Sequence, residues 1–98
     1  MSFNNNNEQL NPGLCIPRVF NNISREKICA IFKSLHIGSI QRMDMIPCGN
    51  FNRVFIYLKW NDGLVASKAR QRILEGKDIK VFYNEPWFWK ISAIRSKS

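Results

Sequence analysis

Two aromatic and two cationic side chains occupy every second position of the stretch from Arg53 to Trp60, RVFIYLKW. Successive side chains of a β-strand point to opposite faces, so one face would carry Arg53, Phe55, Tyr57 and Lys59. The other would carry the apolar residues that a core needs, which are Val54, Ile56, Leu58 and Trp60. Aromatic rings stack on exposed bases and cations bind phosphates, so the first face is typical of a surface that binds single-stranded nucleic acid.

The charge of the chain also favours a polyanionic partner. Its 98 residues carry a formal net charge of +8, which favours nucleic acid or an anionic membrane surface. No apolar run approaches the roughly 18 residues of a membrane span, and the start, MSFNNNNEQL, lacks the features of a signal peptide. We therefore expect an intracellular protein that is not secreted and has no membrane partner.

The residue types that carry most enzyme chemistry are sparse. Cys15, Cys29 and Cys48 are widely spaced and His36 is the single histidine, so we expect neither a metal site nor a cofactor. There is no Gly-rich phosphate loop, and no cysteine has an identifiable base. These observations predict a protein that is not an enzyme.

The first half of the chain predicts a flexible Asn-rich tail over 1–13 and a single domain over 14–95. Residues 14–20 read as a strand, and Pro17 favours an edge position or the first residues of a strand over its middle. Residues 24–37 read as an amphipathic helix that Ser24 caps and Gly38 ends. Residues 39–46 form the next strand. Its inward candidates, Ile40, Met43 and Met45, break strict alternation, so a bulge is expected between the first two.

The second half again predicts a strand, a helix and further strands. After the strand 53–60, Asn61 and Asp62 can cap a helix that Gly76 ends. Its expected apolar stripe consists of Leu64 or Val65, Ala66, Ala69, Ile73 and Leu74. Two strand-like runs follow, 79–83 and 87–94, with Trp87 and Trp89 facing the core, and 96–98 would be a flexible end. The order β-α-β-β-α-β, with a hairpin arm before the last strand, predicts an α+β ferredoxin-like sandwich. In that fold two helices cover one face of a four-stranded antiparallel sheet.

The 53–60 stretch resembles the third-strand signature of the RNA recognition motif. Arg53, Phe55 and Tyr57 match its basic and aromatic places, whereas Val54 and Ile56 replace a glycine and a small residue. Other stretches are similar to its first helix, second-helix end and final strand: SREKICAIFKSLHIG (24–38), LEG (74–76) and KISA (90–93). The resemblance implies a sheet face that stacks two or three bases. It also places Val19 where the first strand usually exposes an aromatic, although Arg18 or Phe20 could be exposed there instead.

Three further stretches, IPRVF, FNRVFIYLKW and NEPWFWKISA, look like small proteins of this fold from large nucleocytoplasmic DNA viruses. This resemblance implies a viral protein that acts in the host cytoplasm or nucleus or is packaged in the virion.

The expected partner is single-stranded RNA or DNA, and RNA is favoured. The site would combine aromatic platforms with cations from four strands: Arg53, Phe55, Tyr57, Lys59, Arg42, Lys90, Arg18 and Phe88. The alternative is that the same open face binds another protein or a second copy of the chain as a homodimer. Lys68, Arg70 and Arg72 read as a solvated helix face.

Overall fold

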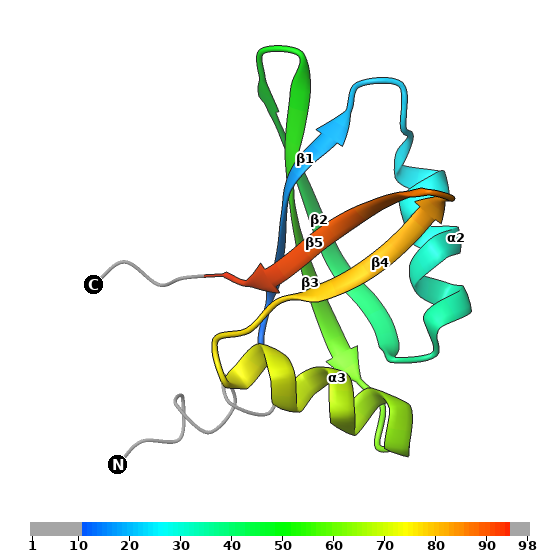
Figure 1. The fold of residues 1–98 in the computed structure, drawn as a ribbon, viewed down its shortest axis with the longest axis vertical. Helices are drawn as coiled ribbons and strands as arrows, with labels where there is room; N and C mark the ends of the chain where they lie inside the picture. The colour runs from blue at the N-terminus through cyan, green and yellow to red at the C-terminus, as the bar shows by residue number, and fades with distance from the viewer. Residues whose placement is uncertain (1–10, 95–98) are drawn as a thin grey trace.

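The computed structural model describes residues 11–94. The elements are β1 (Leu14–Phe20), α2 (Arg25–Leu35), β2 (Gly38–Cys48), β3 (Phe51–Trp60), α3 (Leu64–Leu74), β4 (Ile79–Asn84) and β5 (Trp87–Ala93). They form an α+β fold with one antiparallel sheet, in the order β2-β3-β1-β5-β4, and two helices (Figure 1). The extra strand expected before the last one is β4. It joins the sheet edge, so the sheet has five strands rather than four.

The core lies between the helices and one face of the sheet. Alternation in β3 is as predicted: Val54, Ile56 and Leu58 are buried. Both helices contribute to the same hydrophobic cluster, α2 through Phe32 and α3 through Ile73. The opposite face of β3 carries no residue of this cluster and is left uncovered by the helices.

Local sequence explains most of α2. Ser24 caps it, because its hydroxyl accepts a 3.1 Å hydrogen bond from the backbone N–H of Lys27. The predicted end is wrong by two residues. His36, with a φ of 58°, takes the left-handed C-cap position, and Gly38 instead begins β2.

The start of α3 also differs from the prediction. Its N-cap is Gly63, without a side-chain hydrogen bond, whereas the Asn61 amide donates to the carbonyl of His36. Only part of the predicted apolar stripe is buried: Ala66 and Ile73 are buried, whereas three members are exposed, namely Leu64, Val65 and Leu74.

The first residues that the structure describes are attached to β3. The side chain of Asn11 accepts a 3.1 Å hydrogen bond from the backbone N–H of Trp60, and the Trp60 indole donates to the carbonyl of Pro12. Residues 1–10 of the predicted tail and the predicted end, 96–98, lie outside the described residues.

The position of β1 makes the sheet irregular. β1 lies between β3 and β5, yet it pairs with β5 only at Leu14 and Cys15. Its pairing with β3 shifts register between Ile16 and Val19, where Pro17 has no N–H to donate to a ladder. The predicted position of Pro17 is wrong, because this proline lies in the middle of a central strand. The pairing of β1 with β5 has ended before this point. β1 and β5 are therefore unpaired beyond Cys15.

Candidate nucleic-acid interface

The open face of β3 carries the residues that the sequence placed there. Arg53 and Lys59 are exposed, Tyr57 is 38% exposed and Phe55 is half-buried. Side chains on one face of a strand repeat at about 7 Å, so Phe55 and Tyr57 form two neighbouring platforms. The same alternation adds Phe51 to this row, a residue that the sequence reading missed although the period of two would have found it.

β2 adds charges beside the two platforms. Arg42 pairs with Tyr57, and its guanidinium carbon lies 5.6 Å from the centre of the Tyr57 ring. Arg42 also forms an ion pair of 3.2 Å with Asp44, which pairs with Phe55. A phosphate at this edge would therefore meet one cation and one carboxylate. The register shift between Ile40 and Arg42, predicted as a bulge, keeps Arg42 and Asp44 at these positions.

β1 supplies a thiol rather than an aromatic next to Phe55. Cys15 is the partner of Phe55, and burial raises the pKa of its thiol, an effect that the nearby Arg53 guanidinium partly offsets. Val19 is fully buried, so it provides no platform. Of the alternatives left open, both Arg18 and Phe20 are exposed.

The far end of β1 carries a second aromatic group. The rings of Phe20 and Phe51 are 5.6 Å apart, centre to centre. The guanidinium carbon of Arg18 lies 5.3 Å from the centre of the Phe51 ring. The row of open-face aromatics on β3 therefore continues onto β1 at Phe20.

Phe88 and Lys90 lie on β5, across the gap where β1 and β5 no longer pair. Both side chains are exposed, and they line a hollow of about 300 Å³ together with Pro17 and Arg18. Lys80 of β4 lies over Phe88, with its amine 4.7 Å from the ring centre. The structure therefore brings together the β2 and β3 candidates, while β1 separates Phe88 and Lys90 from Phe55.

The predicted burial of the tryptophans is half right. Trp89 is buried, but Trp87 is 59% exposed. The pairing of β4 with β5 shifts register between Phe82 and Asn84, at the end where Trp87 begins β5. Trp87 is thus placed at the rim of the sheet rather than over the core.

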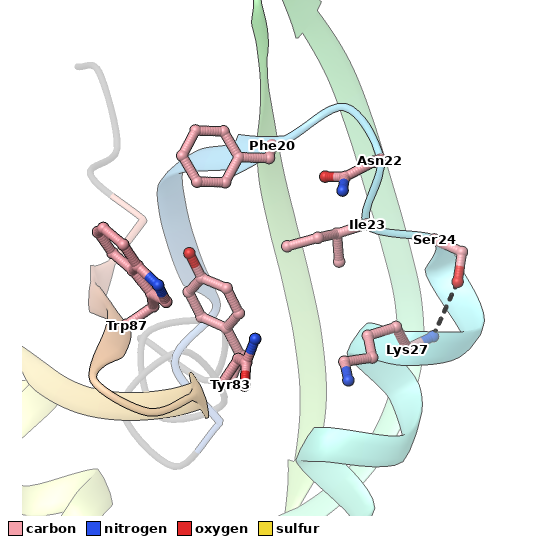
Figure 2. Close-up of a pocket in the computed structure, with 8 residues that line it drawn as sticks. Phe20, Asn22, Ile23, Ser24, Lys27, Tyr83 and Trp87 are labelled. Atoms are coloured by element: carbon pink, nitrogen blue, oxygen red, sulfur yellow. Dashed lines mark hydrogen bonds between the residues drawn. The ribbon is translucent and has the colours of Figure 1, made fainter.

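Trp87 instead lines a pocket that the sequence did not predict. The pocket has a volume of about 620 Å³ and lies between the end of β1, the start of α2 and the β4–β5 turn (Figure 2). Phe20, Tyr83 and Trp87 are its aromatic residues, and Lys27 extends toward it from α2. No local signal marks such a pocket, because its walls come from three separate segments of the chain.

Within the described range, 11–94, no helix is long and apolar enough to cross a membrane. No group of three or more histidine, cysteine or acidic side chains in this range is placed to hold a metal ion.

Comparison with known proteins identifies no relative. No protein-family model matches the chain, and neither does any curated protein or solved structure.

Proposed function

We propose that this chain binds single-stranded nucleic acid on the open face of its sheet, without catalysis. The observation that carries the proposal is the placement of Phe55 and Tyr57 on the uncovered face of β3, between Arg53 and Lys59. Bases of a single strand stack on such rings, and each stacked base contributes about 1–3 kcal/mol. The net charge of +8 favours the polyanion over a neutral partner.

The proposed fold is that of the RNA recognition motif, with β4 added at one edge. The strand order β2-β3-β1-β5 is compatible with the split βαβ arrangement, since β3 pairs with β1 on one side and with β2 on the other. RNA is the proposed strand rather than DNA because of this resemblance. One departure is that β1 offers Cys15 beside Phe55, so two platforms rather than three stand side by side.

An alternative is supported by the exposed apolar surface. Tyr57, Phe82 and Phe88 are 38%, 50% and 39% exposed, and aromatic surface of this kind is also typical of protein interfaces. The alternative is that the open face binds another protein or a second copy of the chain.

Fluorescence anisotropy with labelled U-rich RNA, T-rich DNA and duplex DNA tests the proposal. Phe55→Ala with Tyr57→Ala should weaken single-strand binding at least about 30-fold, because two stacked bases are lost at about 1 kcal/mol or more each. Leu64→Ala with Val65→Ala is the matched control, since both side chains are exposed on α3. Equal affinities of the two double variants would refute the proposal. If light scattering shows that the unmodified chain is a dimer, and only Phe55→Ala with Tyr57→Ala dissociates it, the alternative of a protein interface on the open face would be favoured.

A further inference from the structure

The pocket beside Trp87 is continuous with the proposed binding face. Along β3 the open-face row runs from Tyr57 through Phe55 and Arg53 to Phe51. Phe51 contacts Phe20 at a ring separation of 5.6 Å, and Phe20 is itself part of the pocket wall. A strand that follows the aromatic rings along β3 therefore arrives at the pocket.

The wall of the pocket matches the chemistry of a nucleotide. Its aromatic residues, Phe20, Tyr83 and Trp87, suit a planar base. The side-chain amides of Asn22 and Asn84 each offer donors and an acceptor, as the edge of a base requires. A volume of about 620 Å³ falls in the usual range of small-molecule sites.

The charge of the wall suits a phosphate. Lys27 is the cation among the lining residues, and none of these residues is acidic. Within residues 11–94 no ion pair involves Lys27, so no carboxylate of this range competes with a phosphate for its amine.

The position of Tyr83 is fixed before any ligand binds. Its ring stacks on the buried ring of Trp89, with centres 4.7 Å apart and planes 18° apart. Trp87, at 59%, is the most exposed of the three aromatic residues of the pocket. Figure 2 shows Tyr83 between Trp87 and Ile23, with Phe20 above them. One fixed ring and one exposed ring are the parts of a base clamp.

We propose that this pocket binds one nucleotide of the strand, with its base among Phe20, Tyr83 and Trp87 and its phosphate on Lys27. The inference rests on the proposed function, because the strand reaches the pocket from the sheet face. A base held in the pocket does not stack on the open-face side chains of β3. The pocket therefore fixes which nucleotide follows those stacked on Phe55 and Tyr57, and so fixes the register of the strand.

The test compares Trp87→Ala with Phe82→Ala, which removes a similarly exposed aromatic from the same hairpin but not from the pocket wall. With a U-rich RNA of about eight nucleotides, Trp87→Ala should weaken binding about tenfold and Phe82→Ala much less. Lys27→Gln should reduce the slope of log K against log salt by about 0.7. Uridine monophosphate should shift the methyl signals of Ile23, which lines the pocket, in an NMR spectrum of the unmodified chain.

The outcomes separate this inference from the proposed function. If RNA binding depends on Phe55 and Tyr57 but Trp87→Ala has no effect and Ile23 does not respond, the pocket is overturned and the sheet face stands. If RNA does not bind, the proposed function fails. The pocket then stands only if uridine monophosphate still shifts Ile23 and Trp87→Ala abolishes that shift.

Discussion

Removing two cations from the open face should change how nucleic-acid binding depends on salt. Arg53 and Lys59 flank the aromatic pair, and Arg42 pairs with Tyr57 from β2. Lys90, on β5 beyond β1, is the fourth candidate phosphate contact of the sheet. For a single strand the slope of log K against log salt is about −0.7 for each neutralised phosphate, so these four contacts and the proposed contact at Lys27 predict about −3.5. Arg53→Gln with Lys59→Gln should reduce the magnitude of this slope, to about −2.1.

The slopes convert into affinities that anisotropy titrations can resolve. Between about 50 and about 200 mM salt, the unmodified chain should lose about 130-fold in affinity and the double variant about 18-fold. Both substituted side chains are exposed and outside the hydrophobic cluster, so the fold should not change. A thermal unfolding curve of the variant checks this point.

A matched control separates local contacts from the general attraction of a basic protein. Lys33→Gln with Lys68→Gln removes the same charge from exposed positions on α2 and α3. This control should keep the slope of the unmodified chain. Equal slopes in the two double variants would refute the reasoning, because binding would then follow net charge rather than the open face.

Two further predictions concern the scaffold. Gly38→Ala should lower the free energy of unfolding by about 1–3 kcal/mol in urea denaturation, because a Cβ there would lie 2.5 Å from a backbone carbonyl oxygen of β3. The control is Gly63→Ser, which should not lower this free energy, because nothing lies within 4 Å of a Cβ at Gly63. No loss in Gly38→Ala would contradict the close approach of β2 to β3. A thiol reagent should modify exposed Cys29 and Cys48 quickly and Cys15 slowly, since burial raises the pKa of Cys15 and lowers its thiolate fraction. Bound RNA should slow Cys15 further but not Cys29; equal protection of both would argue against binding at the sheet.

The sequence predicts features that depend on short-range periodicity. The two faces of β3 follow from a period of two, and the β2 bulge follows from the spacing of Ile40 and Met43. The end of α2 and the start of α3 were predicted less well than the Ser24 cap. At the end of α2 a non-glycine residue, His36, adopts the left-handed conformation, and at the start of α3 the side chain of Asn61 is bound to His36 rather than to the helix.

Features that depend on pairing between distant segments were not predicted. β1 and β5 pair only at Leu14 and Cys15 and are separated by a gap beyond that point. No local sequence pattern encodes where two strands diverge. The exposure of Trp87 follows from a register shift in the β4–β5 pair rather than from its hydrophobicity. The aromatic pocket was missed for both of these reasons.

The most direct measurement is photocrosslinking of a U-rich RNA that contains 4-thiouridine, followed by trypsin and mass spectrometry. Trypsin cuts after Arg53 and Lys59, so one peptide, residues 54–59, carries both Phe55 and Tyr57. The account predicts that this peptide is the main crosslinked product and that Phe55→Ala with Tyr57→Ala removes it. Crosslinks confined to the helix peptides 28–33 and 60–68, with none on 54–59, would contradict the claim that the strand lies on the open face of the sheet.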